Sequence, residues 1–321
     1  MNRRVIQSLL VLTALFWGAT FNLVGYTVDH LSPALSAALR YSLASVFTLV
    51  ILGFRAREAL DTLKRAWKPL LAMAGIGVVV FNLFLFLGLR HTTPTNGALI
   101  QATNPLLTAL IAWAFLHERI GRGHRIGTSV SFAGVAVLIL SGSVQRLQAP
   151  NVGDLLCLGA TFCLAAYSVI GGRFLKGVKP VLTTGLTTLM GCAGLWLTVL
   201  AVGPRPDAHT FTSQPAGVWW ALAFVGILST VLAYIFWNYG VSHLGVPDTA
   251  VFFHLVPVFT VLASLAMGQP VTLVQVGAGA VVLVGVFISS RHPAPAPAAA
   301  APAAAAPAPG PVAALPEEAA R

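Results

Sequence analysis

Charged side chains are scarce in this chain of 321 residues, of which they make up only 9%. A soluble domain carries roughly 25% charged residues, so the composition excludes a fold whose surface faces water. Hydrophobic residues reach 57%, and the mean hydropathy is +0.83. The net charge of +10 does not indicate nucleic acid as a partner, because the basic residues gather in alternate segments between apolar runs.

Cysteines and carboxylates are also few. Cys157, Cys163 and Cys192 lie inside apolar runs and form no CxxC pair, which argues against disulfides and zinc. The 9 acidic residues fall in expected loops, in the C-terminal segment or at the ends of apolar runs. We therefore expect no carboxylate at the membrane centre, where proton-driven pumps usually keep one. The same lack argues against an enzyme, a metal site or a cofactor, since embedded hydrolases need paired acids, metal ligands or an activated nucleophile.

Long apolar runs, in contrast, fill most of the sequence. Ten of them are about twenty residues long, enough for a helix to cross roughly 30 Å of hydrocarbon. They cover residues 6–28, 33–54, 69–89, 94–116, 124–142, 153–174, 180–203, 217–241, 247–267 and 271–290.

Basic residues between these spans predict their orientation, because short loops rich in Lys and Arg stay in the cytoplasm. Clusters of them precede the first span and follow the second, fourth and sixth, whereas the intervening loops contain only Arg90, Arg146 and Arg205. Both termini are therefore expected in the cytoplasm. Residues 292–321 are almost all Ala and Pro, a composition typical of a disordered tail.

A segment around Pro105 occurs twice, 152 positions apart (257 − 105 = 152). The matching pairs are Gly88 and Gly240, His91 and His243, Ala98 and Ala250, Pro105 and Pro257, and Thr108 and Thr260. Each repeat would hold five spans, and an odd number inverts the second copy relative to the first. Inverted repeats enclose a site that opens to either side of the membrane. The sequence thus predicts an all-α membrane protein with ten transmembrane helices, arranged as two inverted five-helix repeats (1–146 and 147–291) around a central cavity.

Polar and aromatic side chains inside the spans are the candidates for lining that cavity, because buried polar groups need partners or water. We expect substrate contacts from Trp17, Asn82, Phe86, Gln101, Tyr167, Tyr234, Asn238 and His254. Hydrogen bonding between helices is an equally good explanation for each amide. Pro105 and Pro257 are predicted to act as paired hinges, since each removes a backbone hydrogen bond inside its span; simple kinks are the alternative.

Two ionisable residues near span centres leave their roles open. Arg40 either binds a substrate carboxylate or has a structural role, reaching outward or holding carbonyl groups of a neighbouring helix. The structural role is favoured, because the matching span of the second repeat has no basic residue. His254 either couples a proton to transport or is a neutral, hydrogen-bonded side chain.

The ordered set of residues resembles the EamA-type branch of the drug/metabolite transporter superfamily over about residues 6–290. The resemblance is carried by Leu15-Phe16-Trp17-Gly18, Arg40, Asn104-Pro105-Leu106, His117-Glu118-Arg119-Ile120, Gly127, Gly134, Tyr234, Gly240, Pro257, Gly268-Gln269-Pro270, Gly277 and Gly285. Gln269 is a departure, since the second repeat often has Glu there. The resemblance implies a cavity lined by helices one, three, four, six, eight and nine, and export of amino acids, related metabolites or drugs across the bacterial inner membrane.

We therefore predict a secondary transporter, an exporter that works by alternating access. Import of a vitamin or another small metabolite is the alternative in the same class; an embedded enzyme and a non-transporting scaffold are rivals from other classes. The expected partners are a small-molecule substrate (an amino acid, metabolite or drug) and the lipid bilayer, with no nucleic acid. Spans five and ten, rich in glycine and aliphatic residues, are expected to form a scaffold or the contact of a homodimer.

Overall fold

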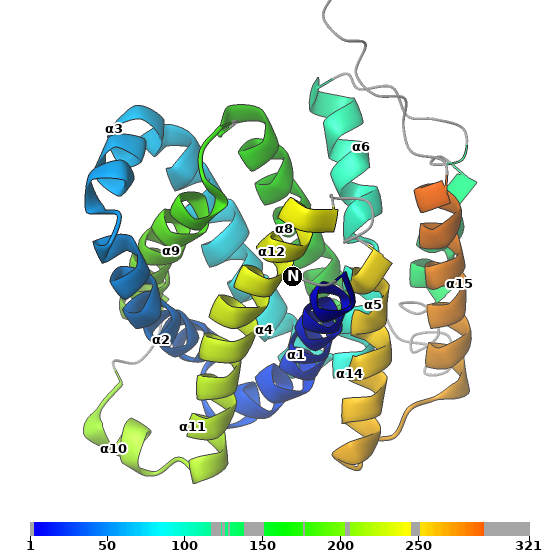
Figure 1. The fold of residues 1–321 in the computed structure, drawn as a ribbon. Coiled ribbons are helices and arrows are strands. Elements are labelled where there is room, and N and C mark those ends of the chain that lie inside the picture. The colour runs from blue at the N-terminus through cyan, green and yellow to red at the C-terminus, as the bar shows by residue number, and fades with distance from the viewer. Residues whose placement is uncertain are drawn as a thin grey trace, which may run out of the picture.

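The computed structural model describes residues 3–116, 151–175, 177–202, 206–244 and 251–291, together with parts of 123–137. These parts of the chain contain helices and no strands, gathered into one bundle (Figure 1). The helices are α1 (Arg3–His30), α2 (Pro33–Gly53), α3 (Ala56–Met73), η1 (Ala74–Val80), α4 (Phe81–His91), α5 (Pro94–Gln101), α6 (Asn104–Leu116), α8 (Val152–Phe174), α9 (Pro180–Val202), α10 (Ala208–Thr212), α11 (Ala216–Ala223), η2 (Phe224–Leu232), α12 (Ala233–Leu244), η3 (Val251–His254), α14 (Leu255–Ala266) and α15 (Leu273–Arg291).

Helix starts follow capping signals that are visible in the sequence. Ser32 accepts a hydrogen bond from the backbone N–H of Leu35 and is followed by Pro33, while Thr93 caps α5 in the same way ahead of Pro94. A hydroxyl before a proline satisfies one free N–H, and the proline occupies a position where none is needed.

Six of the described helical stretches are long and apolar enough to cross a membrane, and a seventh is reached if α5 and α6 count as one bent span. The bend between these two helices is 43°. α14 and the first part of α15 are shorter apolar helices. The protein is thus an all-helical membrane protein. The number ten and the inverted arrangement remain predictions, since expected span five (124–142) is only partly described.

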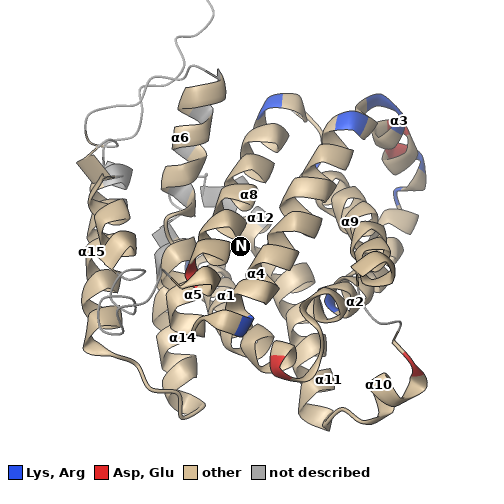
Figure 2. Ribbon diagram, turned by 180° about the vertical axis from the view of Figure 1, so that it is seen from behind, with Lys and Arg blue, Asp and Glu red and all other residues tan. Residues whose placement is uncertain are grey.

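The expected loop after the second span is helical in the structure. α3 begins at Ala56, and its backbone kinks at Ala66, which has φ −129° and ψ 26°. Residues before the kink are rich in charge, and Figure 2 shows basic residues gathered at this end of the bundle. Glu58 accepts a hydrogen bond of 2.7 Å from Lys179, which precedes α9. A charged helix that precedes a membrane span is typical of a segment lying at the membrane surface.

Two π-helices interrupt the third and eighth expected spans. η1 covers Ala74–Val80 and η2 covers Phe224–Leu232. They begin 150 residues apart (224 − 74) and end 152 apart (232 − 80), close to the spacing of the sequence repeat. π-helices are rare and often occur at functional sites. Their paired positions direct attention to the side chains that they present inside the bundle.

Buried polar side chains join α1 to α14 across a close contact. The Asn22 amide donates to the carbonyl of Thr260 (3.1 Å) and accepts from the Ser264 hydroxyl (2.8 Å). The Thr260 hydroxyl in turn donates to the carbonyl of Gly18 (3.0 Å). The absence of a side chain at Gly18 permits this approach, because an added Cβ would lie 2.9 Å from the Val256 carbonyl oxygen.

Glycines of expected spans five and ten form a close contact between these two spans of the same chain. A Cβ on Gly134 would lie 3.0 Å from the carbonyl oxygen of Ala278, and one on Gly285 would lie 2.6 Å from that of Gly127. The Ser131 hydroxyl also donates to the Val282 carbonyl at 2.9 Å. These glycines therefore bring two helices of one chain together, and a homodimer through these spans remains a prediction.

Replacing Gly18 by Ala should destabilise the protein, because the new methyl group meets the backbone of α14. We expect a loss of about 1–3 kcal/mol, typical of overpacking, seen as a lower midpoint of thermal unfolding in detergent. Gly172→Ala is the matched control, since a Cβ there has no neighbour within 4 Å. Equal midpoints for the two variants would contradict the close contact.

Candidate substrate chamber

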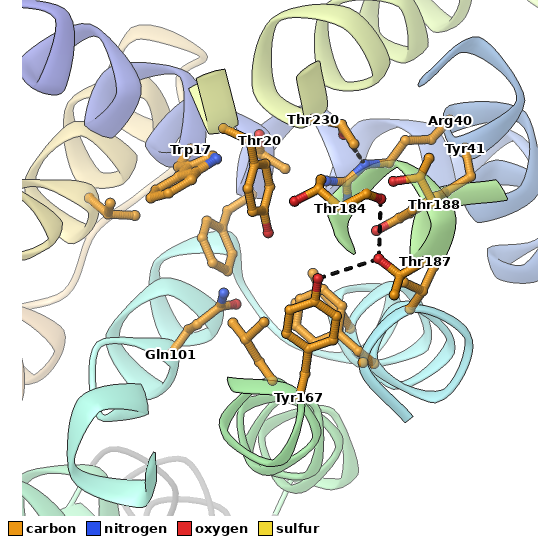
Figure 3. A pocket seen from close by; sticks show the side chains of 18 of the residues that line it. Trp17, Thr20, Arg40, Tyr41, Gln101, Tyr167, Thr184, Thr187, Thr188 and Thr230 are labelled. Carbon is orange, nitrogen blue, oxygen red and sulfur yellow. Dashed lines mark hydrogen bonds between the residues drawn. The ribbon is translucent and has the colours of Figure 1, made fainter. Parts of the chain in front are cut away.

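A central chamber of about 110 Å³ lies between helices from both halves of the chain. Its wall has an aromatic part and a hydroxyl-rich part, with one guanidinium group (Figure 3). The aromatic, hydroxyl and amide residues of the wall are Trp17, Phe21, Tyr41, Phe81, Tyr167, Tyr234, Phe253, Thr20, Thr184, Thr187, Thr188, Thr230 and Gln101. A mixed wall of this kind suits a solute with both apolar and polar parts.

Trp17 of α1 is the centre of the aromatic part. Its ring lies edge-on to Tyr234 at 5.6 Å and to Phe253 at 5.7 Å, measured between centroids. The indole N–H donates to the carbonyl of Ser229 in η2 at 3.0 Å. The Ser229 hydroxyl donates back to the Phe16 carbonyl at 3.0 Å. The π-helix thus holds the indole ring in place against the chamber.

Threonines of α9 form the hydroxyl-rich part. Thr184, Thr187 and Thr188 share one face of this helix, because residues three and four apart are neighbours on a helix surface. The Thr187 hydroxyl donates to the carbonyl of Thr183 at 2.8 Å and lies 3.4 Å from the Tyr167 hydroxyl across the chamber floor. A hydroxyl bonded to its own helix still has acceptor capacity to offer a solute.

Arg40 of α2 places a cation in the wall, with 7% of the residue exposed. Its Nε donates to the Thr230 hydroxyl at 3.1 Å, and one terminal nitrogen donates to the Asn82 side-chain oxygen at 3.3 Å. The Asn82 amide donates in turn to the Val78 carbonyl at 2.7 Å. The Arg40 side chain therefore links α2 to α4 and η2. In the described parts of the chain no carboxylate is paired with it, and the ion pairs found there involve Glu58.

Gln101, the last residue of α5, has an amide oxygen without a hydrogen-bond partner, although that atom is buried. Figure 3 shows the amide directed toward the space between the labelled side chains. Buried polar atoms are nearly always paired with protein or water. An unpaired acceptor in a chamber wall is therefore available to a solute or to water.

A wider space of about 740 Å³, the vestibule, adjoins the chamber at one end. Trp17, Tyr167, Thr184 and Tyr234 line both spaces, so the two are neighbours. The vestibule runs past residues 171–180, where α8 ends and α9 begins. It therefore opens at the end where Lys179 meets Glu58 and basic residues gather (Figure 2).

Hydrogen bonds close the opposite end of the bundle. We call this group of residues the polar latch: Thr92, Thr93, Asn96, Asp154, Thr272 and Gln275. Asp154 is 2% exposed and accepts hydrogen bonds from the Thr92 hydroxyl and the Asn96 amide, the latter at 3.2 Å. The Gln275 amide donates to the Asn96 oxygen at 2.8 Å and to the Thr93 hydroxyl at 3.0 Å.

Backbone packing tightens the same end, because Gly153 lies against the end of α4. A Cβ on Gly153 would be 2.7 Å from the Gly88 carbonyl oxygen and from the Thr92 nitrogen. The latch therefore joins α4 and α5 to α8 and α15 with no room for another atom beside Gly153. The bundle is therefore tightly packed at the latch end, whereas the vestibule adjoins the chamber toward the other end.

The structure brings four of the eight substrate-contact candidates into the chamber wall: Trp17, Gln101, Tyr167 and Tyr234. Asn82 lies behind the wall, bonded to Arg40, and Phe86 is fully buried in the core, so neither lines the described chamber. The side chains of Asn238 and His254 lie outside the described residues. Arg40, for which a structural role was favoured, bonds to the side chains of Thr230 and Asn82 and also lines the chamber, so both of its predicted roles remain predictions.

The two predicted hinge prolines both follow a break in their spans. Pro105 is the second residue of α6, just after the bend that separates it from α5; its side chain is not described. Pro257 is buried in the first turn of α14, after the short 3-10 helix η3. Both positions need no backbone N–H for the helix that follows. A hinge at these breaks remains a prediction.

Sequence reasoning missed the threonines. A signal was present, since Thr184, Thr187 and Thr188 recur at helical spacing inside an otherwise apolar span. The walls supplied by the second and seventh spans go beyond the six helices that the family resemblance implies. Among the described residues, no group of three His, Cys, Asp or Glu side chains is placed to hold a metal ion.

Replacing Gln101 by Leu should leave the stability of the empty protein unchanged or raise it, because the lost amide oxygen has no partner. Asn82→Leu is the matched comparison and should lower the free energy of unfolding by about 1–3 kcal/mol, since Arg40 then loses one of its two acceptors. Thermal unfolding of both variants in detergent measures the difference. A loss in Gln101→Leu as large as that in Asn82→Leu would show that the Gln101 amide has a partner after all.

Comparisons with known proteins identify the family. The model of the EamA-like transporter family matches residues 5–140 and again residues 151–291. An uncharacterized transporter of Bacillus subtilis, YyaM, is 37% identical over 279 residues, which are 86% of this chain and 90% of that protein. A protein of Streptantibioticus cattleyicolor named as a probable terminal-alkyne amino-acid exporter is 26% identical over 88% of this chain and 92% of its own length.

A solved crystal structure shares the fold, with a TM-score of 0.60 and 19% identity over 90% of this chain and 97% of that one. The family and the similar proteins carry transporter names, which agrees with an apolar helical bundle that encloses a chamber. The chain belongs to the EamA-like transporter family, as a multi-pass membrane transporter and not an enzyme.

Proposed function

We propose that this protein is a secondary transporter that moves a small metabolite, such as an amino acid or a drug, by alternating access. The observation that carries the proposal is the chamber itself, with the vestibule toward one end of the bundle and the hydrogen-bonded polar latch at the other. Alternating access needs a central site whose two exits open in turn. In the proposal, the vestibule is the open exit and the polar latch is the closed one.

Two inverted repeats, residues 1–146 and 147–291, form the framework of the proposal. Support comes from the two separate matches to the family model, at 5–140 and 151–291, and from the paired π-helices. Trp17 reaches across from the first repeat to η2 of the second, so relative motion of the repeats would change the chamber. Pro105 and Pro257 are the proposed hinges.

The basic residues gathered at the vestibule end support a cytoplasmic location for that end, with the protein in a bacterial inner membrane. The conformation would then be open to the inside, with the polar latch closing the outside. The exporter name of the relative from Streptantibioticus cattleyicolor favours export. Import of a small metabolite is the alternative. The proposed C-terminal tail, 292–321, lies outside the described residues.

Counterflow in proteoliposomes tests transport directly, with radiolabelled L-leucine and L-phenylalanine first and a wider set of metabolites and drugs after them. Trp17→Phe should lower the flux about fivefold, because the Ser229 carbonyl loses its indole donor, a bond worth about 1 kcal/mol. Trp220→Phe is the control, since Trp220 is 76% exposed on the outer surface of the bundle. Absence of flux for every solute would contradict the proposal.

Weakening the latch should open the outer exit more often. Asn96→Leu removes bonds to both Asp154 and Gln275, one of which involves a charged group, so opening should become about tenfold more frequent. Cys157 reports on it, because this thiol is 1% exposed and packs against Gly88 behind the latch. Its labelling by a membrane-impermeant methanethiosulfonate in intact cells measures the change.

The labelling experiment uses a variant in which Cys163 and Cys192 are replaced, so that Cys157 is the one cysteine left of the three in the sequence. Thr198→Val is the matched control, since the Thr198 hydroxyl bonds only within α9, to Gly194. A labelling rate in Asn96→Leu equal to that in the control would show that the polar latch is not the outer gate.

A further inference from the structure

Arg40 carries a positive charge that its protein partners do not require. It is 7% exposed, and its two acceptors, the Thr230 hydroxyl and the Asn82 amide oxygen, are neutral. A neutral amide could donate to both without burying a charge. Placing an unpaired cation inside a membrane bundle costs free energy, and such residues usually face a partner or a substrate pathway.

No carboxylate in the described part of the chain offsets this charge. Asp154 is bonded within the polar latch, and Glu58 pairs with Lys179 and Arg55 at the vestibule end. The nearest aromatic face is that of Tyr41, 5.5 Å from the guanidinium carbon. A ring face offsets a cation only weakly compared with an anion.

The guanidinium is presented to the chamber together with hydroxyl groups. Figure 3 shows Arg40 on the same side of the chamber as Thr184, Thr188 and Thr230. A guanidinium has five N–H groups in a planar fork, and the Nε–H and one terminal N–H are the ones bonded to protein. The remaining donors match the geometry of a carboxylate, which can also accept from the threonine hydroxyls.

Another part of the wall is suited to an apolar body. The rings of Tyr234 and Phe253 each pack edge to face with Trp17 there, and the unpaired Gln101 oxygen offers one acceptor in the same chamber wall. Arg40 is the one cationic side chain in the described wall. A single cation balances a monoanion and would leave a phosphate dianion partly uncompensated.

We propose that the transported solute carries a carboxylate that binds Arg40, with an apolar or aromatic body against Trp17, Tyr234 and Phe253. This inference rests on the proposed transport function and names the chemical class of the substrate. Binding an anion would neutralise the buried guanidinium, so the occupied chamber is stabilised relative to the empty one.

Paired probes that differ only in the charged group test the inference on the full-length protein in detergent. 3-Phenylpropanoate and its neutral amide, 3-phenylpropanamide, form one pair; L-phenylalanine and phenethylamine, which lacks the carboxylate, form the other. Binding is followed by tryptophan fluorescence, since Trp17 lies in the wall. We expect the carboxylate of each pair to bind at least about tenfold more tightly, as for a charged bidentate hydrogen bond.

Variants assign the preference to Arg40. Arg40→Gln should bring the two members of each pair within about twofold of each other, and Arg40→Lys should retain part of the preference. Lys68→Gln is the control, because it removes an equal charge from an exposed side chain outside the chamber. If Arg40 only joined helices, Arg40→Gln would weaken the binding of both members of a pair equally. That result would overturn the inference.

The wild-type comparison decides even if Arg40→Gln does not fold. Equal binding of both members, or binding of neither carboxylate, would overturn the inference. Counterflow separates this failure from failure of the transport proposal. Flux of neutral or cationic solutes alone would support the transport proposal and contradict carboxylate recognition. Carboxylate binding without any counterflow would support carboxylate recognition and contradict the transport proposal.

Discussion

Polar groups inside hydrocarbon must find partners within the protein, because no water is available to replace them. The contact between α1 and α14 follows from this requirement, since Asn22, Thr260 and Ser264 are bonded to one another and to backbone carbonyls. The π-helices leave carbonyl groups that need hydrogen-bond donors. In η2, the Trp17 indole donates to the Ser229 carbonyl and the Thr230 hydroxyl donates to the Val225 carbonyl. The helix geometry therefore depends on these side-chain hydrogen bonds.

The chamber is where this requirement is relaxed. Threonine hydroxyls return one bond to their own helix and keep a free side, the Gln101 oxygen has no partner, and Arg40 keeps donors in reserve. Such groups are tolerated in a membrane protein where water or a solute can reach them. Several such groups surround this one cavity, whereas Asn22 is bonded through both its amide nitrogen and its amide oxygen.

The two ends of the bundle use different chemistry. At the latch, Asn96 joins the buried carboxylate of Asp154 in α8 to Gln275 of α15, and Gly153 allows backbone contact. At the vestibule, the connection is an exposed ion pair between Glu58 and Lys179. An exposed pair contributes little to stability, whereas a buried network costs more to separate. The difference agrees with a closed end and an open end in one conformation.

Composition and periodicity alone determined the helical membrane class and pointed to several wall residues, among them Trp17 and Tyr234. These follow from the chain itself, because a run of apolar residues in lipid has to be helical. Only the tertiary structure showed that Asn82 supports Arg40, that α3 begins in an expected loop, and that Asp154 bonds to Asn96 at one end of the bundle. Periodicity tells which residues share a helix face, but which face meets which depends on helix rotation and approach. Arg40 and Thr230, 190 positions apart, become neighbours only when the whole bundle has packed.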